Sequence, residues 1–97
     1  KVATAVSELA RNIVMYAKVG EIRLSVVTNA KIGLAIEARD NGPGIPDIDK
    51  VLSGGFRSKT GLGMGLRGVK NIAQEFTVQS APGQGTRVRA VFYLNMR

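Results

Sequence analysis

Two polar side chains near the start of the chain could act on a phosphoryl group. Glu8 and Asn12 are four residues apart in a segment, Val2 to Ala17, whose apolar residues recur every three or four positions. This periodicity predicts an amphipathic helix, on which residues four apart lie on one face. A carboxylate there can accept a hydroxyl proton, and an amide oxygen is a ligand for Mg²⁺. Taken alone, the pair is more simply interpreted as a solvated helix face, and the neighbouring Arg11 could bind phosphate, contact a partner or face water.

A glycine-rich segment carries the second candidate chemistry. Six of the fifteen residues from Gly54 to Gly68 are glycine, and no acidic residue occurs between Lys50 and Gln74. We expect a mobile loop there, followed from about Leu66 by a helix whose N-terminus favours an anion. The cations around the segment are Arg57, Lys59, Arg67 and Lys70. Together these features predict a polyphosphate site, although a solvated glycine linker explains the loop alone equally well.

Three familiar nucleotide-binding motifs do not account for this segment. Residues Gly63 to Gly68 match G-x-G-x-x-G, but a glycine-rich loop precedes them and no acidic residue follows Glu75, whereas the dinucleotide motif needs a strand before it and an acid after it. The eukaryotic-type kinase motifs include a His-Arg-Asp loop, and the chain has no histidine. Ser58-Lys59-Thr60 lacks the glycine that precedes the lysine of a P-loop.

The patterns along the chain predict the elements that must position these groups. The expected elements are a helix over residues 2–17 closed by Gly20, strands over 22–27 and 32–40, a turn at 41–44, a short helix capped by Asp47, a helix from about Leu66, and strands over 76–80 and 88–94. This order lacks the regular alternation of strands and helices that is typical of parallel sheets. It predicts an α+β fold, a two-layer sandwich with a mixed, mostly antiparallel sheet under helices.

Length and composition limit the possible classes of protein. Ninety-seven residues, of which 44% are hydrophobic, predict a single domain over residues 1–97, and no apolar run is long enough for a membrane span. Because cysteine and histidine are absent, a metal would have to bind through oxygen ligands. The net charge of +7 favours an anionic ligand or partner. Nucleic acid is disfavoured, since aromatic residues make up 5% and the cations gather at the glycine segment. We therefore expect a cytoplasmic protein that binds neither nucleic acid nor membrane.

Four segments in order resemble the N, G1, G2 and G3 boxes of the GHKL ATPases, the superfamily of gyrase, Hsp90, histidine kinases and MutL. The segments are Glu8-Leu9-Ala10-Arg11-Asn12, Asp40-Asn41-Gly42-Pro43-Gly44-Ile45, Gly61-Leu62-Gly63-Met64-Gly65-Leu66 and Gly85-Thr86. Within the superfamily, the chain is most similar to the small bacterial serine/threonine kinases of the switch-protein and anti-sigma-factor group, the RsbT-like kinases of the stressosome. Only about sixteen residues separate Ile45 from Gly61, a short ATP lid like that of the group. The resemblance also implies that a strand and a helix are missing upstream of Lys1.

The resemblance implies a role for each matched residue. Glu8 is the expected catalytic residue, which accepts or orients the attacking hydroxyl, and Asn12 is expected to bind Mg²⁺ and ATP. Asp40 would accept a hydrogen bond from the adenine amino group, and Thr86 would join that network directly or through water. The other expected nucleotide-binding residues are Gly42, Gly44, Lys59, Gly61, Leu62, Gly63, Met64, Gly65 and Leu66. Gly42 and Gly44 would let the backbone approach the flat base, and Lys59 would neutralise the γ-phosphate.

The implied function is that of an ATP-dependent protein serine/threonine kinase. Its substrate would be a STAS-domain partner in a bacterial stress or sigma-factor switch, with Mg²⁺ as cofactor and a phosphatase as a further partner. Two alternatives stay open. One is a nucleotide-gated anti-sigma or partner-binding module. The other is the ATP-binding domain of a histidine kinase, in which case the phosphorylated histidine lies elsewhere, because this chain has none.

Overall fold

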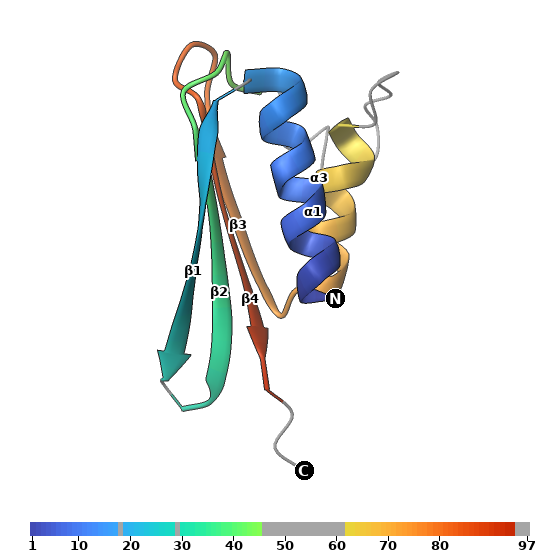
Figure 1. Cartoon of the computed structure of the whole chain (residues 1–97), viewed down its shortest axis with the longest axis vertical. Coiled ribbons are helices and arrows are strands. Elements are labelled where there is room, and N and C mark those ends of the chain that lie inside the picture. The colour runs from blue at the N-terminus through green and yellow to red at the C-terminus, as the bar shows by residue number, and fades with distance from the viewer. Residues whose placement is uncertain (18, 29, 46–61, 95–97) are drawn as a thin grey trace.

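Alternation of apolar and polar residues produces a sheet, and helices cover one face of it (Figure 1). The computed structural model describes residues 1–17, 19–28, 30–45 and 62–94. The elements are α1 (Val2–Asn12), the π-helical turn η1 (Ile13–Ala17), β1 (Gly20–Thr28), β2 (Ile32–Asp40), α3 (Leu62–Ile72), β3 (Glu75–Ser80) and β4 (Thr86–Tyr93). The short helix expected after Asp47 and the loop expected before Gly61 lie outside the described residues.

The strands follow the order β1-β2-β4-β3, and each described pairing is antiparallel. The expected α+β sandwich of helices on a mostly antiparallel sheet is therefore confirmed. In this register Asp40, the last residue of β2, lies opposite Thr86, the first residue of β4. Two residues that are far apart in the sequence thus meet at one end of the sheet.

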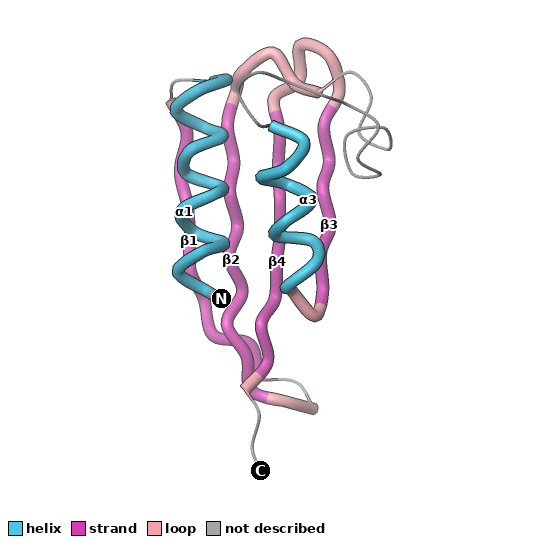
Figure 2. The backbone as a smooth tube through the Cα atoms, turned by 90° about the vertical axis from the view of Figure 1, so that its right-hand side faces the viewer, coloured by secondary structure: helices cyan, strands magenta, loops and turns pink. Residues whose placement is uncertain are grey.

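The core of the described residues forms between the sheet and the apolar faces of α1 and α3. Figure 2 shows α1 in front of β1 and β2, and α3 in front of β4 and β3. The helices contribute Leu9, Leu66 and Val69, each at most 2% exposed, and β2 contributes Ile36. Because side chains alternate along a strand, this packing also decides which residues at the strand ends face the helices and which face away from them.

The first helix differs from the expected continuous helix over residues 2–17. Its α-helical part ends at Asn12, where the N–H of Ile13 is shared between the carbonyls of Ala10 and Leu9, and a π-helical turn follows. Apolar periodicity cannot separate the two kinds of turn, because both keep one face of the helix on the core. Gly20 does not close the helix; it begins β1. A Cβ on Gly20 would lie 2.5 Å from the carbonyl oxygen of Arg39, so glycine lets this strand start tightly against its neighbour.

The helix α3 begins earlier than expected, at Leu62 rather than about Leu66. Its first turns include Gly63 and Gly65, and each glycine lowers helix stability by about 1 kcal/mol relative to alanine. Burial of a leucine or valine side chain contributes about 1.5–3 kcal/mol, and Leu66 and Val69 are almost completely buried. Tertiary packing therefore outweighs the poor local propensity that favoured a loop.

Two glycines in the turn between β3 and β4 have positive φ angles, 76° at Gly83 and 75° at Gly85, but different surroundings. A Cβ on Gly83 would meet no described atom within 4 Å, whereas one on Gly85 would lie 2.2 Å from the carbonyl oxygen of Asp40. Alanine at Gly83 adds only the cost of a left-handed backbone, about 1–2 kcal/mol. We predict that Gly85→Ala lowers the free energy of unfolding by at least about 3 kcal/mol. Urea denaturation of both variants measures the difference, and equal losses would contradict the steric clash.

Part of the helix-facing side of the sheet extends beyond the helices. Its exposed apolar side chains are Leu24, Val26, Ile32 and Leu94. Leu24 and Val26 lie on β1 and Ile32 begins β2, and Leu94 follows β4 and donates its backbone N–H to the Ile32 carbonyl at 2.8 Å. In the described ranges, neither helix has the length and apolar composition needed to cross a bilayer.

Candidate functional site

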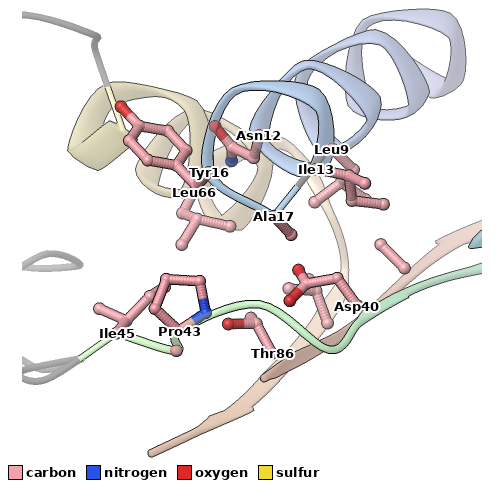
Figure 3. Close-up of a pocket in the computed structure, with 13 residues that line it drawn as sticks. Leu9, Asn12, Ile13, Tyr16, Ala17, Asp40, Pro43, Ile45, Leu66 and Thr86 are labelled. Atoms are coloured by element: carbon pink, nitrogen blue, oxygen red, sulfur yellow. The ribbon is translucent and has the colours of Figure 1, made fainter. Parts of the chain in front are cut away.

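A pocket opens between the helical layer and the strand ends, where α1 and η1 lie over the end of β2 and the start of β4 (Figure 3). Its volume is about 550 Å³ when the solvent at its mouth is counted. The side chains with polar atoms are Asn12, Tyr16, Asp40 and Thr86, and the apolar walls include Leu9, Ile13, Ala17, Ile45, Leu66 and Val88. Apolar walls with a few polar groups suit a flat ligand whose edges carry hydrogen-bonding atoms.

Strand pairing and a local hydrogen bond set the position of the Asp40 carboxylate. Asp40 ends β2 opposite Thr86, so both side chains reach the same end of the pocket. The backbone N–H of Gly42 donates to Asp40 Oδ1 at 2.9 Å. This bond orients the carboxylate and leaves its other oxygen as an acceptor. Figure 3 shows the carboxylate pointing from the strand toward η1, across the floor of the pocket.

A hydroxyl network holds Thr86, and its central residue is Ser80, which was not among the predicted site residues. The Ser80 hydroxyl accepts from the Ile45 N–H at 2.7 Å, donates to the Gly85 carbonyl at 3.0 Å and lies 2.9 Å from Thr86 Oγ1. Since the one proton of Ser80 goes to Gly85, Thr86 is the donor to Ser80. Thr86 Oγ1 then presents only acceptor lone pairs to the pocket. No local motif marks Ser80, because its three partners come together only in the folded chain.

Close contact between the two helices brings Glu8 and Asn12 against Gly65. A Cβ on Gly65 would lie 3.1 Å from Glu8 Oε2 and 3.3 Å from both terminal atoms of the Asn12 amide. Glu8 Oε2 also lies 3.9 Å from Arg11 Nη1, across a partly exposed ion pair. The expected shared face of Glu8 and Asn12 is therefore confirmed. It faces the beginning of α3 rather than open solvent.

The Asn12 amide has a buried polar atom in the pocket whose hydrogen bond a ligand could supply. Its Nδ2 is buried and has no hydrogen-bond partner within the described residues. A buried polar atom without a partner costs about 1–3 kcal/mol, so ligand binding next to this amide would relieve a penalty. Rotation of the amide by half a turn exchanges its nitrogen and oxygen, and the group can then offer either a donor or an acceptor.

Gly65 and Gly68 both lie in α3 but have different surroundings, and alanine substitutions at the two positions should have different effects. A Cβ on Gly68 would meet no described atom within 4 Å, in contrast to the crowding at Gly65. We predict that Gly65→Ala displaces the ends of the Glu8 and Asn12 side chains and weakens Mg²⁺-ATP binding about tenfold. Gly68→Ala should leave binding unchanged and raise the free energy of unfolding by about 0.5–1 kcal/mol. Calorimetric titration and urea denaturation measure the two effects, and unchanged ATP binding by the Gly65 variant would contradict this role.

Gly42 and Gly44 were expected to let the backbone approach the base. In the structure, close packing within the protein already requires glycine at both positions. A Cβ on Gly42 would lie 2.6 Å from the Cβ of Ala17, and one on Gly44, where φ is +80°, would lie 2.0 Å from the carbonyl oxygen of Ala81. These contacts bring the turn after β2 close to η1 and to the turn after β3. Gly44 also lines the pocket, so an additional contact with a ligand stays a prediction.

The remaining candidate residues fall into three groups. Leu66 is buried and lines the pocket. Leu62, Gly63 and Met64 belong to the first turn of α3. Lys59 and Gly61, as well as Arg57, lie outside the described residues. Tyr16 and Ala17 also line the pocket and were not among the predicted site residues, although their place in the predicted helix over residues 2–17 offered a signal.

The donor set is suited to a divalent cation that arrives with phosphate groups. The described residues contain no cluster of three or more histidine, cysteine, aspartate or glutamate side chains that could hold a metal by themselves. Mg²⁺ commonly keeps one or two protein ligands and takes the others from phosphate oxygens and water. Asn12 could supply such a single ligand through its amide oxygen, once the amide is rotated so that the oxygen takes the place of the buried Nδ2.

Comparisons with known proteins agree on one family. The family model described as "Histidine kinase-, DNA gyrase B-, and HSP90-like ATPase" matches residues 1–96. The serine/threonine-protein kinase RsbT of Bacillus subtilis (strain 168) is 50% identical over 95 residues, which are 97% of this chain and 71% of that protein. An anti-sigma F factor of Caldanaerobacter subterraneus subsp. tengcongensis is 34% identical over 101 residues, covering 96% of this chain and 68% of that protein.

A solved structure shares the fold. The histidine kinase domain of a blue-light activated histidine kinase from Erythrobacter litoralis EL346 superposes with a TM-score of 0.59 and is 22% identical. The similarity covers 94% of this chain and 45% of that chain. At this identity the superposition speaks for the fold alone, and it agrees with the observed sheet and helix layers.

Proposed function

Because the chain belongs to the histidine kinase-, DNA gyrase B- and HSP90-like ATPase family, we propose that it is an ATP-dependent protein serine/threonine kinase that acts on a STAS-domain protein. The relative that is 50% identical carries the name of a serine/threonine-protein kinase, which supports this activity. The observation that carries the proposal is the meeting of Asn12, Asp40 and Thr86 around one pocket, with Glu8 one helical turn from Asn12. The STAS-domain substrate rests on the resemblance to RsbT-like kinases.

Adenine is the part of ATP that fits the strand end of the pocket. The free oxygen of Asp40 would accept a hydrogen bond from the adenine amino group, and the acceptor lone pairs of Thr86 would bind a water beside the ring. Ile45 and Leu66, which are 8% and 2% exposed, supply apolar surface for the faces of the base. Such a site uses an acceptor to select an amino group, so it distinguishes adenine from a base that has a carbonyl there.

The phosphate groups would then lie toward Asn12 and the first turn of α3, whose backbone N–H groups have no partner inside the helix and favour an anion. Asn12 would hold Mg²⁺, which when bound neutralises charge on the phosphate oxygens. Glu8 would accept the proton of the substrate hydroxyl while the oxygen of that hydroxyl bonds to the γ-phosphorus. The bond between the γ-phosphorus and the β–γ bridging oxygen breaks at the same time. The products are ADP and a phosphorylated serine or threonine.

A second candidate function is sequestration of a protein partner under nucleotide control. The specific observation in its favour is the similarity to an anti-sigma F factor at 34% identity. The two functions are compatible, because one nucleotide pocket can serve both. A Glu8 variant without phosphoryl transfer distinguishes the two functions. If the variant still binds the partner, that binding does not depend on phosphoryl transfer.

Intact-mass measurement tests the kinase proposal directly. The chain is incubated with Mg²⁺-ATP and each STAS-domain protein of the source organism, and a gain of one phosphoryl mass on one of them is expected. A reaction with the serine or threonine of that protein replaced by alanine is the control. ATP hydrolysis without a mass gain on any candidate would contradict the kinase and favour a gyrase-like ATPase.

A further inference from the structure

The sheet face turned away from the helices carries two arginines side by side, at the end of the sheet that also holds the pocket. Arg39 on β2 and Arg87 on β4 are direct partners in the antiparallel register. Their neighbours Asp40 and Thr86 line the pocket on the helix side, so by alternation the arginines lie on the opposite face. Like charges directly opposite each other destabilise a sheet. The arginine pair is therefore a cost to folding that an anionic ligand would offset.

These arginines line a polar groove on the same face. The groove encloses about 820 Å³ when open solvent is counted, and its lining also includes Asn41, Gln79 and Gln84, together with Asp40 and Thr86, which it shares with the pocket. Gln79 is the register partner of Arg87 on the other side, so guanidinium and amide groups follow one another across β2, β4 and β3. Guanidinium groups donate pairs of hydrogen bonds to carboxylates or phosphates. The groove therefore suits a ligand rich in acceptor oxygens.

The charge of Arg87 is not compensated within the described part of the chain. Arg39 Nη1 lies 3.9 Å from Glu21 Oε1, and in the next row of the sheet Arg89 Nε lies 3.7 Å from Glu37 Oε2. Arg87 makes no ion pair with a described residue, although its side chain is exposed in the groove. An unpaired cation beside the Gln79 amide is available to an incoming carboxylate without the loss of an existing ion pair.

We infer that this groove, with Arg39 and Arg87, docks an acidic segment of a protein partner. The charges around it favour a protein over a nucleic acid. Glu21 and Glu37 flank the arginines, and they would repel a continuous row of phosphates, whereas a protein segment can place cationic or neutral residues opposite them. The groove shares Asp40 and Thr86 with the pocket, but the two arginines lie on the opposite face of the sheet, so a segment held by them contacts the face away from the pocket. This docking does not depend on the proposed kinase activity.

A binding experiment without nucleotide tests the docking surface. The probe is a short fluorescein-labelled peptide of alternating aspartate and serine, titrated with the chain while fluorescence anisotropy is measured. We expect Arg87→Gln to weaken binding about threefold to tenfold. Arg23→Gln is the matched control, because Arg23 lies on the same face, pairs with Glu21 at 3.6 Å and is not part of the groove. The control should change binding less than twofold. ATP affinity should be the same in both variants.

Amide shifts in a nitrogen-15 correlation spectrum locate the peptide. Shifts at Gln79, Gln84 and Arg87 are expected, with the residues of α1 unaffected. Equal weakening by the two arginine variants would show attraction by net charge alone and overturn the proposal. Shifts confined to the nucleotide pocket would overturn it as well. So would tighter, Arg87-dependent binding of a single-stranded oligonucleotide, which would make the groove a nucleic-acid site.

Discussion

Replacement of Asp40 by asparagine is expected to weaken ATP binding about 100-fold, as measured by calorimetric titration. The two side chains have the same shape, so the variant should keep the pocket. The Gly42 N–H already donates to Oδ1 at 2.9 Å, and in the variant the amide oxygen would keep this bond. The amide nitrogen must then face the base, where its N–H groups oppose the amino group of adenine. A donor that meets a donor loses the bond and leaves both groups unsatisfied.

The base of the nucleotide provides a control for this prediction. Inosine triphosphate has a carbonyl oxygen where ATP has its amino group, and the side-chain amide introduced by the substitution can donate to it. We expect Asp40→Asn to lose ATP affinity while the affinity for inosine triphosphate stays equal or rises, so that the preference between the two nucleotides reverses. Equal losses for both nucleotides would mean that Asp40 supports the pocket rather than contacting the base.

Replacement of Glu8 by glutamine is expected to slow phosphoryl transfer at least about 100-fold and to change ATP affinity less than threefold. The amide cannot accept the hydroxyl proton, but it fits the same space beside Gly65, where Glu8 Oε2 lies 3.1 Å from the position of an added Cβ. Single-turnover transfer from radiolabelled ATP to the STAS-domain substrate measures the rate. Titration of the variant with ATP measures binding.

Two further variants show whether the effect belongs to the carboxylate of Glu8. Arg11→Gln removes the ion-pair partner at 3.9 Å and keeps the carboxylate, so its rate should fall far less than that of Glu8→Gln. Glu21→Gln removes an exposed carboxylate on the far face of the sheet and controls for net charge. If Glu8→Gln keeps the wild-type transfer rate, the assignment of Glu8 as the catalytic residue is wrong.

The layers of the fold could be predicted from sequence because their signals are local. Period-two alternation at residues 32–40 and helical periodicity at residues 2–17 depend only on neighbours in the chain, and the strands and the first helix appear close to the expected bounds. The start of α3 was predicted too late for the opposite reason. Gly63 and Gly65 disfavour a helix locally, and only tertiary packing against α1 and the sheet favours one there.

The sequence by itself determined the chemical groups of the site and their local order: a carboxylate and an amide one helical turn apart, an acid at a strand end, and glycines at the start of a helix. Tertiary structure decided the rest. It placed Asp40 opposite Thr86, linked Thr86 to Ser80 and turned Arg39 and Arg87 to the face away from the pocket. These results depend on strand register and helix packing, which join residues distant in the chain, and no local pattern encodes the partner of such a residue.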